Sequence, residues 1–402
     1  MNQFNHNSFR ETEAISDMLK KTRDLVPLIR ENSAKAEEAR RVPESVIEAL
    51  TAAGTFRTSV PKRYGGLEAS MKTMLDVSSI VGEGDGGTSW VVTLCNGCAW
   101  LAGLYPVAAQ DDVWGNNPDA RVSGVLTPSA EAKKVAGGYE VSGKWFYNSG
   151  SWHADWAVLG FPVVNEAGEA VDQGLALIPR SDLEIEETWF VAGMAASASN
   201  CLVAKNAFVP EHRVLSVPTA LGDEYPSEVT DNEPFYRSAF VPLLCMILAG
   251  PQLGMGRAAL DFVISKAATR PIAYTFFNAQ ADSTAFQMQI AEAATRIDTA
   301  HLHAYRAAAD IDNAAINGIK LDLIARTRVR NDAGVVIENI TRAIDTLMFA
   351  HGAGGFANVS PLQRLWRDSA VAARHSVTLP IISSEIYGKA LLGVKEQITP
   401  LI

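Results

Sequence analysis

The feature that most constrains the fold of this chain is a block of short alternating segments, residues 121–212, between two stretches with helical periodicity. Within the block, runs rich in valine and aromatic residues are separated by turn residues, as expected for β-strands. Gly137-Gly138 predicts one hairpin turn, and residues 165–168 (NEAG) predict another. The block therefore predicts a small antiparallel β domain inside a mostly helical protein.

The stretch before this block, residues 8–104, has apolar residues at the spacing of amphipathic helices. Its last part, residues 88–104 (TSWVVTLCNGCAWLAGL), is apolar nearly all round. A helix without a polar face must be covered on every side, so this segment predicts a deeply buried helix.

The helical pattern returns at Phe235 and continues almost to the end of the chain. Long helices are predicted over residues 249–270, 285–312 and 321–350, and residues 351–377 supply a fourth. Four long helices joined by short connections form a bundle. The predicted fold class is α+β, mainly α, with an N-terminal helical domain (1–117), a middle antiparallel β domain (118–217) and a C-terminal four-helix bundle (218–402).

Composition excludes several functional classes. The net charge of −10 and the absence of a basic block argue against nucleic acid or an anionic membrane as a partner. No apolar run of about 18 residues predicts a membrane span, and the N-terminus does not resemble a signal peptide, so a cytoplasmic protein is expected. Four cysteines are too few for a disulfide framework. Cys95 and Cys98 lack the second pair that a zinc site needs, so no metal is expected.

Residues 351–377 contain the first candidate binding residues. Gly354-Gly355 forms a turn whose backbone N–H groups can approach an anionic ligand. Ser360 is placed as an N-cap before Pro361. Helical spacing brings Arg364, Asp368 and His375 near one face, with small residues beneath the histidine. The alternative interpretation is a capped helix whose arginine–aspartate pair ties two helices together.

A second candidate lies in the β block, in residues 143–156 (GKWFYNSGSWHADW). Its tryptophans and tyrosine offer flat apolar walls, and Asn148, Ser149 and Ser151 offer hydrogen bonds. This combination suits a planar heteroaromatic ring with polar edges, such as a flavin, in a cleft between the β domain and the helices. The alternative is a sheet face with aromatic cross-strand pairs and no ligand.

Five segments, in order along the chain, carry a resemblance to a known family: residues 60–70 (VPKRYGGLEAS), 124–156, 193–214, 270–308 and 361–393. Together they resemble the acyl-CoA dehydrogenase fold and, within it, the oxygenase component of two-component flavin-dependent monooxygenases (group D). The resemblance covers almost the whole chain. It implies three domains, a homotetramer, and a flavin between the β domain and the bundle, with part of each site supplied by a neighbouring subunit.

The resemblance also implies roles for individual residues. Contacts to the isoalloxazine ring are expected from Leu126, Thr127, Tyr147, Asn148 and Ser149, with Ser149 as a catalytic residue at the flavin N5 edge. Arg270 and Gly354-Gly355 are expected at the phosphate end, where a cation and backbone N–H donors are required. Reduced FMN, or alternatively FAD, would arrive from a separate NAD(P)H:flavin reductase and react with O2 as co-substrate.

The residues distinguish between dehydrogenase and oxygenase chemistry. Acyl-CoA dehydrogenases of this fold need a glutamate base after the arginine–aspartate pair or in the first bundle helix, but residues 372–377 (AARHSV) and 241–251 contain no carboxylate. The monooxygenases carry a histidine here, which predicts His375 as catalytic. It would deprotonate a phenol, indole or amine, or protect a C4a-hydroperoxyflavin by a hydrogen bond. A core histidine bonded to a carbonyl is the alternative.

The substrate pocket is predicted from apolar and aromatic side chains: Trp90, Cys98, Trp100, Tyr274, Phe276 and Phe277. The phenol-hydroxylating members carry a histidine where this chain has Cys98, and a thiol is a weak donor that cannot replace it. We therefore expect hydroxylation or N-oxygenation of a small ring-bearing substrate, such as an indolic or other natural product, rather than of a simple phenol. The alternatives are an acyl-CoA dehydrogenase-like desaturase, a nitrososynthase-type amino-sugar N-oxygenase, and a relative that binds flavin without turnover.

Overall fold

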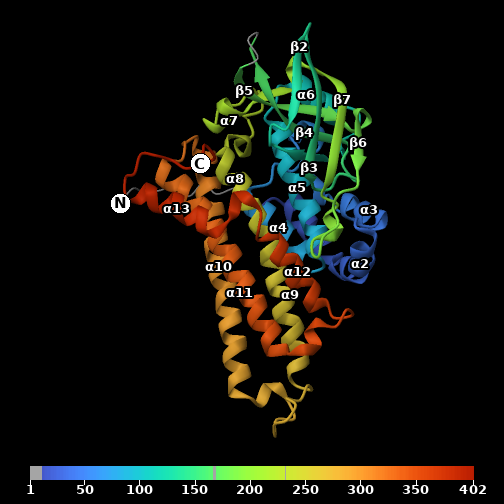
Figure 1. Cartoon of the computed structure of the whole chain (residues 1–402), viewed down its shortest axis with the longest axis vertical. Coiled ribbons are helices and arrows are strands. Elements are labelled where there is room, and N and C mark those ends of the chain that lie inside the picture. Colours follow the sequence, from blue (N-terminus) through green and yellow to red (C-terminus); the bar gives the residue numbers. More distant parts are fainter. Residues whose placement is uncertain (1–10, 166–168, 231) are drawn as a thin grey trace.

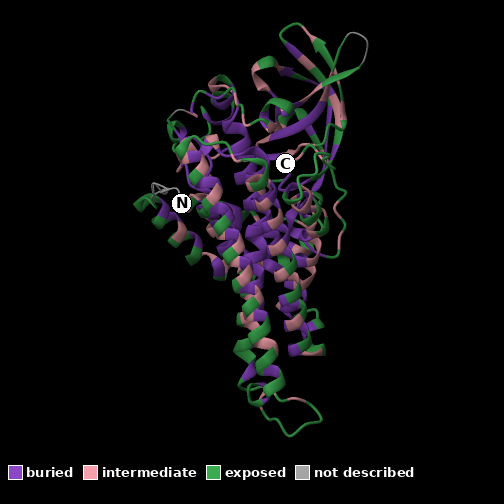
Figure 2. Ribbon diagram, turned by 90° about the vertical axis from the view of Figure 1, so that its left-hand side faces the viewer, coloured by how far each residue is buried: buried purple, intermediate pink, exposed green. Residues whose placement is uncertain are grey.

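Three parts of the chain are arranged along the long axis of the computed structural model, which describes residues 11–165, 169–230 and 232–402 (Figure 1). The strands lie at one end, the N-terminal helices lie beside and below them, and the long C-terminal helices extend to the other end. Buried residues fill the middle of the molecule, where the parts meet, whereas the free end of the bundle is mostly exposed (Figure 2).

The N-terminal part is helical, as predicted. Its helices are α1 (Glu13–Asp24), α2 (Val26–Ala39), α3 (Glu44–Ala52), α4 (Met71–Gly82), α5 (Gly86–Gly103) and α6 (Val107–Trp114). Every residue of α5 except Leu94 is buried, which confirms the prediction of a helix covered on all sides. Asp85 begins this helix by accepting a hydrogen bond from the backbone N–H of Thr88.

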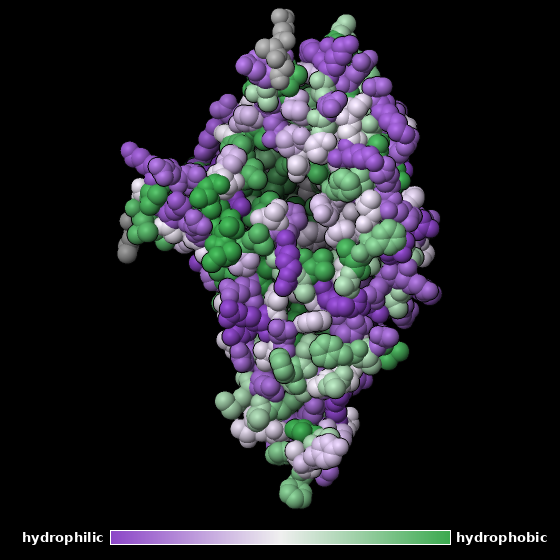
Figure 3. Space-filling view, viewed as in Figure 1, coloured by the Kyte–Doolittle hydropathy of each residue, from purple (hydrophilic) through white to green (hydrophobic). Residues whose placement is uncertain are grey.

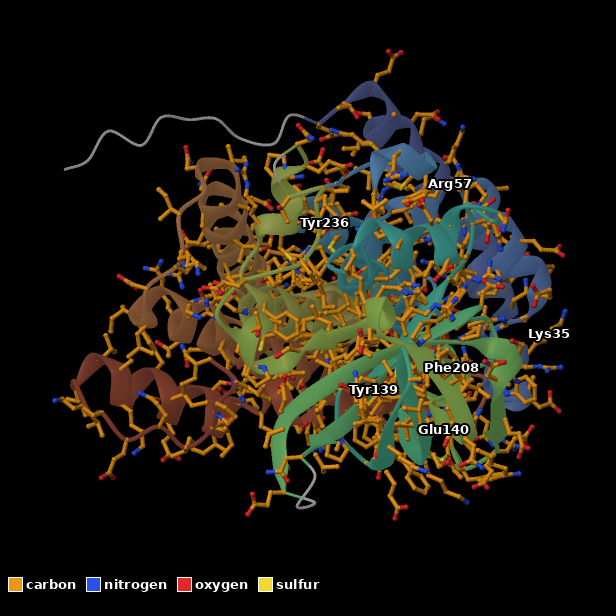
Figure 4. The ribbon with its side chains drawn as sticks, turned by 90° about the horizontal axis from the view of Figure 1, so that it is seen from above. Lys35, Arg57, Tyr139, Glu140, Phe208 and Tyr236 are labelled. Atoms are coloured by element: carbon orange, nitrogen blue, oxygen red, sulfur yellow. The ribbon has the colours of Figure 1, made fainter. Side chains whose placement is uncertain are left out.

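Three glycines on α5 allow its neighbours to approach closely. A Cβ at Gly87 would lie 2.7 Å from the Cβ of Ala196, and one at Gly97 would lie 2.5 Å from Cδ1 of Ile247. A Cβ at Gly103 would lie 2.2 Å from Cε1 of Tyr236, whose hydroxyl donates a hydrogen bond to the carbonyl of Ser59. In the view from above, Tyr236 lies among closely spaced side chains (Figure 4), and it is fully buried. The glycines therefore allow close packing of α5 against elements of the middle and C-terminal parts.

The middle part is a sandwich of two four-stranded sheets with the orders β1-β4-β5-β8 and β2-β3-β7-β6. The strands are β1 (Val122–Val125), β2 (Ala130–Val135), β3 (Gly138–Asn148), β4 (Trp156–Val164), β5 (Ala170–Pro179), β6 (Leu183–Glu186), β7 (Asn200–Pro210) and β8 (Val214–Ser216). Trp145 of β3 is fully buried and donates its indole N–H to the carbonyl of Gly160 in the facing sheet, 2.7 Å away. This single side chain thus helps to join the two sheets.

One strand pair departs from the predicted antiparallel domain. β1 and β4 are parallel, with Val122 opposite Trp156. The chain leaves β1, forms the β2–β3 hairpin in the other sheet and only then returns as β4, and such a crossover allows a parallel return. Gly137, with a φ of +77°, lies in the predicted turn between β2 and β3. Residues 166–168 of the second predicted turn lie outside the described residues.

The C-terminal part contains α7 (Val217–Leu221), α8 (Phe240–Met246), α9 (Gly250–Ala267), α10 (Thr284–Asn317), α11 (Leu323–His351), α12 (Pro361–Ala372) and α13 (Pro380–Leu391). The first three bundle helices are long, as predicted, but the fourth is not a single long helix. Within the predicted fourth helix, residues 351–377, α12 covers twelve residues, and α13 begins beyond this range, after residues 373–379. A residue before proline is disfavoured in helical conformation, and Leu379, which precedes Pro380, has φ −54° and ψ 119°.

One stretch corrects the expectation about apolar runs. Residues Phe240–Ala267 are long and apolar enough to cross a membrane by length and composition alone, and this is the one such stretch among the described residues. However, 78% of its most apolar window is buried inside the protein. The stretch therefore serves as a core helix of the bundle.

Candidate active site

Three predicted site residues converge where the three parts meet. Trp90 lies near the start of α5, Ser149 directly follows β3, and His375 follows α12. The indole Nε1 of Trp90 donates a hydrogen bond to Oγ of Ser149, 3.0 Å away, and the ring centroids of Trp90 and His375 are 5.9 Å apart. On the face seen in Figure 3, the surface is hollowed between the β domain and the helices, and the walls of the hollow are largely hydrophobic.

His375 reaches this position by a route that helical spacing did not predict. Helix α12 ends at Ala372, so His375 does not continue the face of Arg364 and Asp368. It instead begins a short 3-10 turn (Ser376–Thr378), and its Nδ1 accepts a long hydrogen bond of 3.4 Å from the backbone N–H of Val377. An Nδ1 that accepts leaves the proton of a neutral imidazole on Nε2.

The surroundings of His375 keep its ring neutral. Burial lowers the pKa of His375 to about 4, because the charged imidazolium loses its hydration in this position. A neutral ring with its proton on Nε2 is a hydrogen-bond donor toward a ligand. Of the two roles predicted from the sequence, the geometry thus favours donation to an oxygen atom over removal of a proton.

Asn148 carries two polar atoms that the protein leaves unpaired. Its side chain is fully buried, and among the described residues neither Oδ1 nor Nδ2 has a hydrogen-bond partner. An unpaired buried amide is costly, at about 1–3 kcal/mol for each group. A ligand with a donor and an acceptor on one edge, as the isoalloxazine ring has, would satisfy both atoms.

An aromatic wall stands beside these residues. Tyr147 adopts a left-handed backbone conformation with a φ of +67°, and 72% of its side chain is exposed. Its ring meets that of Trp189 edge to face, with the centroids 6.0 Å apart. A non-glycine residue at positive φ is strained, and such strain often accompanies a functional site. The wall and the polar atoms of Asn148 together fit a flat ring with polar edges.

The predicted Leu126-Thr127 turn directly follows β1 and lies close to β3. The carbonyl of Leu126 accepts a hydrogen bond of 2.7 Å from Nε2 of Gln173, and the side chain of Thr127 is exposed. Oγ of Ser129 donates to the carbonyl of Lys144, 2.8 Å away, which ties the loop to β3 shortly before Asn148. The Thr127 side chain is therefore exposed beside the β domain, and a contact with a ligand stays a prediction.

Two buried carboxyl groups, those of Asp85 and Asp368, lie near the start of α5, the helix that carries Trp90. Asp368 of α12 accepts a hydrogen bond from the backbone N–H of Met194 and packs against Gly86 at the start of α5. Burial raises the pKa of Asp368, and the negative charge of the neighbouring Asp85 raises it as well. Asp85 accepts two hydrogen bonds from Thr88 at the N-terminus of α5, so it is the better place for the negative charge.

The arginines before Asp368 bind the N-terminal helices. Arg364 donates to Oε2 of Glu37 at 3.0 Å and to Oγ of Ser33 at 2.7 Å, and Arg367 pairs with Oε1 of Glu37 at 2.5 Å. The alternative interpretation of this motif, a tie between two helices, therefore describes what α12 and α2 do. The tie and the Asp368 contact hold α12 beside the site.

The residues predicted at the phosphate end form a second group at the opposite end of α12. Nη1 of Arg270 lies 2.7 Å from Nε2 of His351, and a Cβ at Gly354 would lie 2.9 Å from Nη2 of Arg270. Gly355 packs against the ring of His351. Twelve residues of α12 span about 18 Å. Arg270 and the Gly354-Gly355 turn come together, but not beside Ser149.

Several predicted pocket residues do not lie beside Ser149 and His375 in the folded structure. Trp100 is fully buried, packs against Tyr225 and Phe240 and donates to the carbonyl of Phe235, so it is a core residue. Cys98 is buried with its sulfur close to Gly124 of β1, and burial raises the pKa of its thiol. Three aromatic side chains of the loop between α9 and α10 are exposed at the free end of the bundle and cannot line a pocket beside Trp90 within one chain: Tyr274, Phe276 and Phe277.

Sequence reasoning missed three residues that the fold adds to the site. Trp189 lies in an irregular segment, and only the close approach of β6 and β7 to β3 brings it to Tyr147. Ser197 and Ser199 belong to residues 193–200 (GMAASASN). This segment contributes to the family resemblance, but no role was predicted for its serines. Oγ of Ser199 lies 2.8 Å from that of Ser149 and 2.7 Å from that of Ser197.

One other cavity does not belong to this centre. A cavity of about 750 Å³ lies between the N-terminal helices and the start of the β domain, lined by residues of α1 and α3 together with Arg57 and Arg121. Among the described residues, no cluster of three or more histidine, cysteine or acidic side chains could hold a metal ion.

His153, in the turn after Ser149, gives a prediction about acid stability. Its side chain is buried, and burial, then Arg121 and Arg41, lowers its pKa to about 4. Because the unfolded chain binds this proton more tightly, the contribution of His153 to stability is complete above about pH 6.5 and is lost as pH falls toward 4. At pH 5 the loss is about 2 kcal/mol.

We therefore expect a His153→Phe variant to lose less stability than the wild type in acid. Thermal melts at pH 7.5, 6 and 5 measure the effect, and the difference in Tm between variant and wild type should grow as pH falls. A difference that is constant with pH would show that His153 does not ionise on unfolding.

Comparison with family models supports the architecture. Residues 11–111 match the N-terminal domain model and residues 246–380 match the C-terminal domain model of acyl-CoA dehydrogenases.

Curated relatives of the chain are oxygenases. It is 32% identical over 370 residues to the oxygenase subunit HsaA of a flavin-dependent monooxygenase from Rhodococcus jostii (strain RHA1), covering 92% of this chain and 97% of the relative. It is 30% identical to the oxygenase component of an FADH2-dependent resorcinol hydroxylase from Rhizobium sp. (strain MTP-10005), covering 92% of both chains. Among solved structures, XiaF from Streptomyces sp. in complex with FADH2 and glycerol matches with a TM-score of 0.90 and 35% identity, covering 96% of this chain and 98% of XiaF.

Proposed function

Because the chain belongs to the family of oxygenase components of flavin-dependent monooxygenases with the acyl-CoA dehydrogenase fold, we propose that it uses reduced flavin and O2 to hydroxylate a small ring-bearing substrate. The observation that carries this proposal is the neutral His375 against Trp90, whose indole binds Ser149, at a position where the family resemblance would place the carboxylate base of a dehydrogenase. Bound reduced flavin would supply the electrons that activate O2 for transfer of one oxygen atom.

Different residues would contact different parts of the flavin. Asn148 would bind polar atoms on the edge of the ring, Ser149 its N5 side, and Tyr147 with Trp189 would cover its flat face. Nε2–H of His375 would donate to an oxygen atom near the ring. The buried Trp90 beside His375 would help to exclude water, which suppresses wasteful release of H2O2.

We further propose that FADH2, supplied by a separate NAD(P)H:flavin reductase, is the cofactor. Two of the relatives named above support FAD rather than FMN, since one is FADH2-dependent by name and the other is in complex with FADH2. Arg270, His351 and the Gly354-Gly355 turn suit a phosphate. About 18 Å of helix separates them from His375, more than the ribityl phosphate arm of one flavin spans, so we propose that they serve the flavin of another copy in a homotetramer.

Isotope incorporation tests the reaction. The protein is mixed with FAD, NADH, a flavin reductase and indole as the probe substrate, or resorcinol as the simple-phenol comparison, under 18O2. One 18O atom per product molecule is expected, with FMN in place of FAD as the comparison. Anaerobic bleaching of bound oxidised flavin by an acyl-CoA, without oxygen transfer to either probe, would instead favour the desaturase alternative.

A further inference from the structure

Three buried serines form a continuous row of hydroxyl groups behind the proposed flavin ring. Ser149, Ser199 and Ser197 are 6%, 3% and 0% exposed. Their Oγ atoms are linked by contacts of 2.8 Å between Ser149 and Ser199 and 2.7 Å between Ser199 and Ser197. Within the part of the chain that the structure describes, the side chain of Ser197 has Ser199 as its one hydrogen-bond partner.

A strained turn places Ser197 and Ser199. Met194 and Ala198 on either side of the 3-10 turn Ala195–Ser197 have left-handed φ values of +58° and +48°. Non-glycine residues are strained in this region and stay there only when the surrounding structure holds them. The turn is held by hydrogen bonds from the N–H of Gly150 to the carbonyl of Ser197 and from Oγ of Ser151 to the carbonyl of Ala198, both 2.8 Å.

Trp90 fixes the possible directions of the hydrogen bonds in this row. An indole N–H can only donate, so one acceptor position of the Ser149 oxygen is always occupied. The three hydroxyl groups have three protons but only two links between them. One proton is therefore always left over, and its position decides what Ser149 offers to a ligand.

Two arrangements of the protons give Ser149 opposite roles. If Ser199 donates to Ser149, both lone pairs of the Ser149 oxygen are occupied, and its own O–H points to the ligand. If Ser149 donates to Ser199, the Ser149 oxygen keeps one free lone pair and accepts from the ligand. N5 of a flavin is a hydrogen-bond acceptor when the ring is oxidised and carries a hydrogen when it is reduced.

We propose that Ser197, Ser199 and Ser149 form a reversible hydroxyl relay, in which Ser199 is the positioning residue that lets Ser149 serve both redox forms of the flavin. This proposal rests on the proposed function, because it takes a flavin edge as the ligand of Ser149. The relay matters most for the reduced form. When Ser149 accepts from the reduced ring, its own buried proton needs Ser199 as an acceptor.

Replacing Ser199 by alanine is expected to weaken the reduced form selectively. The Ser149 proton then has no acceptor while the oxygen binds the reduced ring, which corresponds to about a tenfold loss of affinity. Binding of oxidised flavin, to which Ser149 donates, should change little. Anaerobic titration calorimetry with oxidised FAD and photoreduced FAD measures both dissociation constants without any turnover.

The matched control is Ser151→Ala. This change removes a buried hydroxyl that donates to the carbonyl of Ala198 and does not belong to the relay. This variant should change both dissociation constants by the same factor. A Ser199→Ala variant that also changed both equally would overturn the relay alone. A wild-type protein that bound neither form of flavin would overturn both the relay and the proposed function.

Discussion

Replacing His375 by alanine is expected to slow oxygen transfer to substrate by about 100-fold while reduced flavin still binds. The variant loses the Nε2–H donor that the long bond from Val377 to Nδ1 directs toward the ligand. Without this donor, charge that develops on a reacting oxygen is unsupported, and O2 consumption should end mainly in H2O2. Product formed per O2 consumed, with peroxide measured in parallel, is the decisive quantity.

A His375→Gln variant is the control for this experiment, because its amide nitrogen can donate from a position close to that of Nε2. It should recover part of the lost coupling. Since the pKa of His375 is about 4, the ring stays neutral at higher pH, and coupling in the wild type should not change with an ionisation near pH 6.5. Normal coupling in the alanine variant, or a coupling step near pH 6.5, would remove His375 from the proposed role.

Mixing two inactive variants is expected to restore activity to about a quarter of the wild-type value. Arg270 and His375 lie near opposite ends of α12, so in an oligomer with shared sites each flavin would meet His375 of one chain and Arg270 of another. Arg270→Ala should weaken flavin binding by about 10- to 100-fold. In randomly mixed oligomers of equal amounts, one site in about four combines two native halves.

Co-expression of Arg270→Ala and His375→Ala chains, assayed below the dissociation constant of the arginine variant, gives the measurement. Co-expression of His375→Ala with Ser149→Ala is the matched control, because both changes affect the same end of α12. That pair should leave no site with both native residues unless the two residues come from different chains. If the first pair recovered no more activity than the second, each site would be built within one chain.

Periodicity was sufficient to predict the order of the three parts and the buried nature of α5, because both depend on how apolar residues alternate with polar ones. It also placed Ser360 as the N-cap of α12, a local feature. It failed where tertiary structure decides. Ala372 ends the helix that was expected to continue through His375, and β1 joins its sheet in parallel after a crossover.

The candidate site shows the same division. Ser149, Trp90 and His375 could be chosen from residue type and family resemblance, and the structure places them in contact. Trp100 was predicted to line the pocket for the same reason as Trp90, because both are aromatic. It instead points into the core, because ten residues along a helix turn the side chain to another face. The roles of Ser197 and Ser199 depend on a left-handed turn at Met194 and Ala198, which no local pattern predicts for such residues.

The glycine contacts of α5 have a consequence for redesigning the enzyme. An added carbon would meet Ala196 and the backbone of Ser197 at Gly87 and the ring of Tyr236 at Gly103, and the same helix carries Trp90. Directed evolution toward new substrates should therefore find few tolerated changes along this helix. Leu94 is its one residue that is not fully enclosed, and beneficial substitutions should accumulate there and in the loops that border the hollow. Helix α5, which positions Trp90 beside Ser149, therefore tolerates few substitutions.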